Sequence, residues 1–94
     1  PAHIDAEALR EAMLAVRGVE AVHDLHVWTL TSGVVAMSAH AIAPTVQEHP
    51  RVLADLHAAA ARFGILHSTI QLEGEPLAAC CGEFADSPLT PATR

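Results

Sequence analysis

Imidazole and carboxylate side chains recur in the apolar segments of this chain, which contains seven histidines. His23 lies in the segment Val22–Trp28, and His40 lies near the end of a second apolar segment that begins at Val34. Glu73 ends a third segment, in which polar and apolar residues alternate. Imidazole and carboxylate groups are the ligands that Zn²⁺ prefers, and Co²⁺, Ni²⁺ and Cd²⁺ accept similar sets. These residue types therefore predict a divalent-metal site.

The first two segments are predicted to form a β-hairpin, because Ser32-Gly33 between them is a typical two-residue turn. With this turn, His23 faces Ile42 and becomes a diagonal neighbour of His40 on one face of the sheet. The two backbones are then about 7–8 Å apart, a distance that two imidazoles can close around one ion. His26 is expected on the opposite face, outside the reach of this ion.

The third strand is predicted to follow a helix that starts between residues 46 and 50 and stops at Gly64. A strand–helix–strand crossover is normally right-handed and makes its two strands parallel. Glu73 then lies level with His40, whereas His67 lies roughly 20 Å away along the strand. Glu73 is therefore the predicted third ligand.

The two cysteines, Cys80 and Cys81, are adjacent in the sequence. Neighbouring cysteines rarely pair with each other, and free thiolates suit metal binding or redox chemistry in a reducing compartment, which favours a cytosolic location. The chain that leads to them, and the loop that carries His49, both leave the predicted sheet at the edge where His40 lies. An inert tail is the alternative interpretation of the cysteine pair.

The predicted element order is α-β-β-α-β, which is an α/β (α+β) fold. Residues 5–17 form the first helix, with Asp5 as its N-cap. A chain of 94 residues has room for one small core of this kind. We expect one domain over residues 1–75 and a flexible tail over residues 76–94, which are rich in Pro, Thr and Ser toward their end.

Composition excludes several classes of function. The net charge is −6 and only five residues are basic, so nucleic acid is not an expected partner. No run of about 18 apolar residues is present, and no leader precedes the first helix, so no membrane span or secretion signal is expected. The chain starts without methionine, and we expect it to be a soluble domain cut from a longer protein.

Three runs, Gly18–Trp28, Ser38–His40 and His67–Glu73, resemble the cytoplasmic C-terminal domain of cation diffusion facilitator transporters, which export divalent metals. The likeness covers about residues 3–75, and its specific part is H-D-L-H-V-W followed by H-x-T-I-Q-x-E. The resemblance implies a metallochaperone-like, ferredoxin-like fold with two helices on a three-stranded mixed sheet. It also implies a homodimer below the transmembrane domain of a parent transporter, at the cytoplasmic face of a membrane.

Position by position, the resemblance implies that His23 and His40 are metal ligands and that Glu73 completes the same site. It implies that His49 or Gln71 contributes to a second ion. Some members of the family carry a histidine where this chain has Gln71, whose amide is a weaker ligand.

The cysteines Cys80 and Cys81 resemble the cysteine-containing tails of other family members. Those tails hold an extra ion, often together with the neighbouring protomer. Thiolate ligands would favour Zn²⁺ or Cd²⁺ at such a site.

The sequence thus predicts a non-enzymatic regulatory domain, in which binding of a Zn²⁺-like ion shifts a homodimer and assists proton-coupled cation efflux. One alternative is a free-standing metal carrier, although the Cys-x-x-Cys loop usual in carriers is not in this sequence. A second is a small-molecule-binding regulatory domain. A third is a zinc hydrolase, for which the sequence offers no separate general base.

Overall fold

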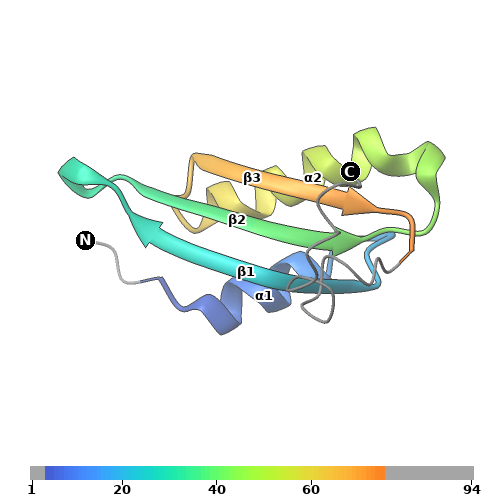
Figure 1. Ribbon diagram of the computed structural model, residues 1–94, viewed down its shortest axis with the longest axis horizontal. Helices are drawn as coiled ribbons and strands as arrows, with labels where there is room; N and C mark the ends of the chain where they lie inside the picture. The colour runs from blue at the N-terminus through green and yellow to red at the C-terminus, as the bar shows by residue number, and fades with distance from the viewer. Residues whose placement is uncertain (1–3, 76–94) are drawn as a thin grey trace, which may run out of the picture.

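Residues 4–75 are described by a computed structural model of the chain (Figure 1). The predicted tail, with Cys80 and Cys81, lies outside these residues. Among the described residues, no helix is long and apolar enough to cross a bilayer. The elements follow in the predicted α-β-β-α-β order: helix α1 (Ala6–Leu14), strand β1 (Ala21–Thr29), 3₁₀ turn η1 (Thr31–Gly33), strand β2 (Val35–Ile42), 3₁₀ turn η2 (Val46–Glu48), helix α2 (His49–Arg62) and strand β3 (His67–Glu73).

The three strands form one mixed sheet in the order β1-β2-β3. Strand β1 is antiparallel to β2, and β2 is parallel to β3, as the crossover rule predicts. Within residues 4–75, both helices lie behind the sheet in Figure 1, and we call the opposite face of the sheet the open face. The strand pairing arranges the residues of the open face in four rows: Ala21–Ile42–Glu73, His23–His40–Gln71, His26–Ser38–Thr69 and Trp28–Ala36–His67.

The core fills the space between the helices and the sheet. Leu9 and Met13 of α1, Leu56 of α2 and Met37 of β2 are at most 1% exposed. Burial of each such side chain contributes about 1.5–3 kcal/mol relative to its exposed state. Because side chains alternate along a strand, the packing of Met37 against the helices turns His40 to the open face.

The two helices are fixed at their ends by polar contacts. Asp5 caps α1, and its Oδ1 accepts two backbone N–H groups at 3.0 and 3.2 Å. After α1, the chain passes close to α2 at Gly18, where an added Cβ would lie 3.2 Å from Val52 Cγ2. Beside it, Arg51 Nη1 donates to the Arg17 carbonyl oxygen at 2.9 Å. The end of α1 is thereby joined to the start of α2.

The hairpin turn differs from the prediction, because it contains three residues, Thr31–Gly33, instead of two. The Leu30 N–H donates to the Val34 carbonyl oxygen at 2.6 Å and closes this longer turn. A regular strand beyond such a turn would pair His23 with Ala41, whose side chain is buried among the core residues. The extra residue alone would therefore have moved His23 away from His40.

A β-bulge in β1 shifts the register a second time. The pairing is irregular between His23 and His26, where Asp24 has the left-handed φ of 56°. Beyond the bulge, His23 lies directly opposite His40, so the predicted diagonal arrangement is wrong in detail. His26 pairs with Ser38 and lies on the open face with His23, so its predicted place on the other face is also wrong.

Candidate metal centre

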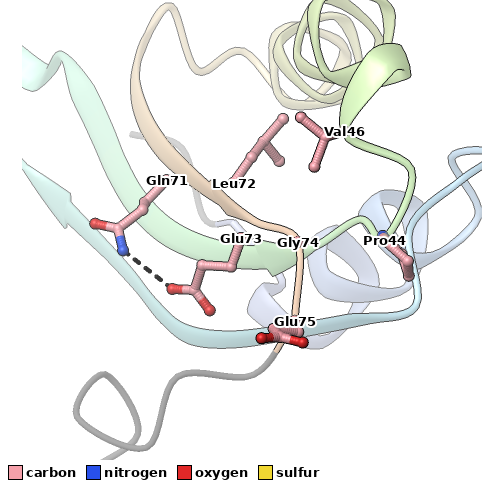
Figure 2. Close-up of a pocket in the computed structure, with 7 residues that line it drawn as sticks. All are labelled: Pro44, Val46, Gln71, Leu72, Glu73, Gly74 and Glu75. Carbon is pink, nitrogen blue, oxygen red and sulfur yellow. Dashed lines mark hydrogen bonds between the residues drawn. The ribbon is translucent and has the colours of Figure 1, made fainter.

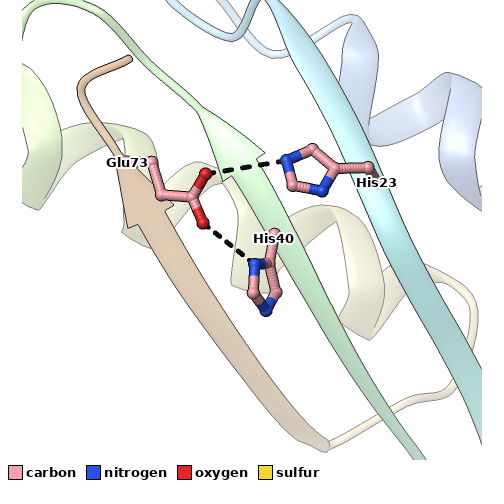
Figure 3. A group of neighbouring side chains, drawn as sticks. All are labelled: His23, His40 and Glu73. Carbon is pink, nitrogen blue, oxygen red and sulfur yellow. Dashed lines mark hydrogen bonds and ion pairs between the residues drawn. The ribbon is translucent and has the colours of Figure 1, made fainter. Parts of the chain in front are cut away.

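One histidine or glutamate from each strand meets at one end of the open face: His23 of β1, His40 of β2 and Glu73 of β3 (Figure 3). Each offers one ligand atom, and these atoms all lie within 4.8 Å of one another. His40 Nδ1 lies 2.9 Å from Glu73 Oε2, and His23 Nε2 lies 3.6 Å from Glu73 Oε1. The structure thus brings together the three residues that the strand topology predicted.

The spacing of these donor atoms suits a small divalent cation. Zn²⁺ binds imidazole nitrogen and carboxylate oxygen at about 2.0–2.2 Å in tetrahedral geometry, which separates two ligand atoms by about 3.4 Å. The distances of 2.9 and 3.6 Å, which run to the two different oxygens of Glu73, lie on either side of this value, and the three donor atoms all lie within 4.8 Å of one another. Two imidazoles and one carboxylate leave one position of a tetrahedron for water or a further ligand. The donor set therefore fits Zn²⁺, and Co²⁺ or Cd²⁺ accept similar ligands.

Glu73 supplies negative charge in a buried position. Its side chain is only 2% exposed, whereas the side chains of His23 and His40 are 24% and 26% exposed. A buried carboxylate is costly unless hydrogen bonds and positive charge compensate it. Its Oε2 accepts hydrogen bonds from His40 Nδ1 at 2.9 Å and from Gln71 Nε2 at 3.0 Å. With both imidazoles neutral, the three ligands carry one negative charge, which favours a bound cation.

Gln71 and His49, the residues assigned by resemblance to a second ion, make other contacts. Gln71 directs its amide nitrogen to Glu73, so it supports the carboxylate of the three-residue cluster. His49 Nε2 lies 2.7 Å from the Ala43 carbonyl oxygen and must carry the hydrogen of that bond. Only Nδ1 of His49 is then left as a metal ligand. A second ion at these residues stays a prediction, as do Cys80 and Cys81.

Two residues beside the cluster were not predicted from the sequence to belong to the site: Asp24 was missed, and His26 was excluded because it was expected on the opposite face. His26 and Asp24 line a hollow of about 360 Å³ on the open face, next to His40. Asp24 Oδ2 lies 3.8 Å from His23 Nδ1, on the side of the ring away from Glu73. A signal was present, because aspartate is depleted in strands and is one of the few residues that accept a left-handed backbone.

A second hollow of about 560 Å³ adjoins Glu73 at the end of β3 (Figure 2). Leu72 and Val46 face each other on one side of this strand, and the carboxylates of Glu73 and Glu75 lie on the other. Glu75 is exposed, so it adds negative charge where the hollow meets solvent.

Comparison with known proteins identifies cation efflux proteins as relatives of this chain. The family model described as the cytoplasmic domain of cation efflux proteins matches residues 1–75. A cadmium, cobalt and zinc/H(+)-K(+) antiporter of Bacillus subtilis is 35% identical over 78 residues, which cover 80% of this chain and 25% of the relative. The metal cation efflux system protein CzcD of Cupriavidus metallidurans is 38% identical over 78 residues, which cover 81% of this chain and 25% of that protein.

An animal relative and a solved structure extend the comparison. The proton-coupled zinc antiporter SLC30A8 of Xenopus tropicalis is 40% identical over 74 residues, which cover 78% of this chain and 20% of the antiporter. The chain thus spans about a quarter or less of the length of these curated relatives. The metal-bound C-terminal domain of the CzcD transporter superposes with a TM-score of 0.69 at 38% identity, covering 74% of this chain and 99% of that domain.

The family match extends over most of the chain and includes every strand of the sheet. The α-β-β-α-β fold agrees with that of the CzcD domain. Both findings confirm the family and the fold that the motifs around His23 and Glu73 predicted. The chain belongs to the family of cytoplasmic domains of cation efflux proteins.

Proposed function

We propose that this chain is the metal-responsive cytoplasmic domain of a membrane transporter that exports Zn²⁺-like cations. In this proposal, His23, His40 and Glu73 bind the cation on the cytosolic side. The observation that carries it is the convergence of these three donors, from three strands, within 4.8 Å around a buried carboxylate. The names of the relatives support the choice of cation, since they include cadmium, cobalt and zinc.

The mechanism is a linkage between cation binding and conformation. When bound, the cation supplies two positive charges that neutralise the buried carboxylate. For His40 to bind the cation through Nδ1, the hydrogen that it donates to Glu73 would leave Nδ1 and Nε2 would take one up from solvent, so that the ring stays neutral; Gln71 would continue to hold the carboxylate in place. Because these groups come from three strands, the conformation in which they meet is favoured. A coupling of about 1–3 kcal/mol is enough to change the equilibrium constant between two conformations 5- to 150-fold.

The conformation that responds is, in this proposal, that of a homodimer. The domain would dimerise beneath the transmembrane part of its parent transporter, at the cytoplasmic face of the membrane, and couple cytosolic cation level to proton-driven efflux. The proton coupling is supported by the name of the Xenopus relative. His49 or Gln71 would contribute to a second ion, and Cys80 or Cys81 to a further one shared with the partner subunit.

Titration calorimetry on the metal-free domain tests the site. We expect the zinc affinity of His40→Ala to fall at least about 100-fold, because even loss of a group that only orients a metal ligand costs 10- to 100-fold. His67→Ala is the matched control, since His67 lies on the open face at the opposite end of the sheet. Sedimentation of the same samples with and without zinc measures dimerisation. Equal zinc affinity in His40→Ala and the unaltered domain would refute the site.

A further inference from the structure

Asp24 has a backbone conformation that few residues accept. Its φ of 56° lies in the left-handed region, where glycine is unstrained and asparagine and aspartate are the best tolerated of the other residues. It is also in the interior of β1, where aspartate is otherwise unfavourable. Asp24 is thus unsuited to a regular strand but suited to the left-handed conformation, which indicates that β1 needs this conformation at this position.

The local requirement is the register in which β1 pairs with β2 at His23. From the hairpin turn to His26, β1 pairs with β2 in a register that, if continued, would place His23 opposite Ala41. The bulge at Asp24 adds one residue to β1, and His23 pairs with His40 instead. A one-residue shift moves a side chain to the other face of a sheet. Without the bulge, His23 would point toward the helices while His40 and Glu73 stayed on the open face.

The side chain of Asp24 adds a second contribution. Its Oδ2 lies 3.8 Å from His23 Nδ1, within ion-pair range although longer than a hydrogen bond. The other nitrogen, Nε2, is the one that faces Glu73. A carboxylate on one side of a histidine ring favours the hydrogen on that side and leaves the lone pair of the opposite nitrogen for a metal.

We propose that Asp24 is the positioning residue of the His23, His40 and Glu73 site. Its backbone makes the bulge that turns His23 to the open face, and its carboxylate holds the ring with Nε2 toward the cation. Asp24 does not itself bind the cation. This inference rests on the proposed function, since it assigns to Asp24 the assembly of the same cation site.

Three substitutions separate the two contributions. Asp24→Asn keeps tolerance of the left-handed backbone and an acceptor oxygen while removing the charge. Asp24→Gly keeps the backbone and removes the side chain, whereas Asp24→Val disfavours the backbone conformation because valine is β-branched. If Asp24→Val does not fold, Asp24→Ala replaces it, because alanine pays a smaller energetic cost for the left-handed backbone than a β-branched residue does. Zinc affinity of the whole 94-residue chain is measured for each, beside His40→Ala.

From highest to lowest, the expected order of zinc affinity is the unaltered domain, Asp24→Asn, Asp24→Gly and then Asp24→Val. We expect a loss of at most about 10-fold for Asp24→Asn, a loss of about 10- to 100-fold for Asp24→Gly, and a loss for Asp24→Val as large as that of His40→Ala. Two metal-free NMR measurements accompany the titrations. The ¹⁵N shifts of His23 report a Nδ1–H ring that changes toward Nε2–H in Asp24→Gly. Backbone NOEs report pairing of His23 with His40 that changes to Ala41 in Asp24→Val.

The outcomes distinguish this inference from the proposed function. If His40→Ala binds zinc as well as the unaltered domain, the proposed function fails. If His40→Ala loses binding but Asp24→Gly retains full affinity and the same His23 ring form, the role of the carboxylate is overturned. If folded Asp24→Val, or Asp24→Ala in its place, retains both the pairing of His23 with His40 and full zinc affinity, the role of the bulge is overturned.

Discussion

Glu73→Gln removes the charge of the candidate metal centre while it keeps the size of the side chain. Loss of an outer partner of a metal ligand costs 10- to 100-fold in affinity, so loss of a direct ligand should cost at least about 100-fold. With zinc at about 100 times the dissociation constant of the unaltered domain, binding stabilises that domain by about 2.7 kcal/mol. The same zinc concentration stabilises the variant by only about 0.4 kcal/mol.

These free energies convert to a large difference in unfolding temperature. In domains of this size, 1 kcal/mol changes the Tm by about 4–8 °C. Zinc should therefore raise the Tm of the unaltered domain by about 11–22 °C and that of Glu73→Gln by about 2–3 °C. Without zinc, the two should differ by less than about 1 kcal/mol, because a glutamine oxygen in the position of Oε2 still accepts the hydrogen bonds from His40 and Gln71, and no charge is buried.

Thermal unfolding followed by circular dichroism, before and after addition of zinc to chelator-treated protein, measures these differences. Glu75→Gln is the matched control, since it makes the same chemical change two residues later, at an exposed position outside the three-residue cluster. We expect Glu75→Gln to respond to zinc as the unaltered domain does. If zinc raised the Tm of Glu73→Gln as much as that of this control, Glu73 would not be a ligand.

Two further predictions concern the fold. Leu56→Ala should lower the free energy of unfolding by about 2–5 kcal/mol, measured with urea, because Leu56 is fully buried in the core. Asp5→Ala should lower it by about 1 kcal/mol, because α1 loses its cap, and an unchanged urea midpoint would show that this cap contributes nothing.

Much of the fold could be predicted because apolar residues have a clear period in this sequence. Polar and apolar residues alternate in the segment that ends at Glu73, and this alternation identified β3. Pro50 lies in the first turn of α2, which begins at His49, within the predicted range of residues 46 to 50. The parallel pairing of β2 with β3 followed from the handedness of crossovers, and it brought the end of β3 level with His40.

The position of His23 was predicted on the correct face through two errors that cancel. The turn is one residue longer than the Ser32-Gly33 pair suggests, which would have moved His23 to the helix side. The bulge at Asp24 moves it back, and the local signal for this bulge is the aspartate itself, a residue that is depleted in strands. His26 lies between the turn and the bulge, so its position shows the result of the first shift alone. Its predicted face was therefore wrong.

The three donors lie at one end of the sheet and belong to its first, central and last strands. Strands β1 and β3 are the two edges, and in the absence of a shared ligand each edge can open without the other. A cation held by His23, His40 and Glu73 would act as a cross-link, so that amide hydrogens at the start of β1 and the end of β3 exchange with solvent as one cooperative unit. The hairpin around Thr31–Gly33, at the far end of the sheet, would keep its own faster exchange.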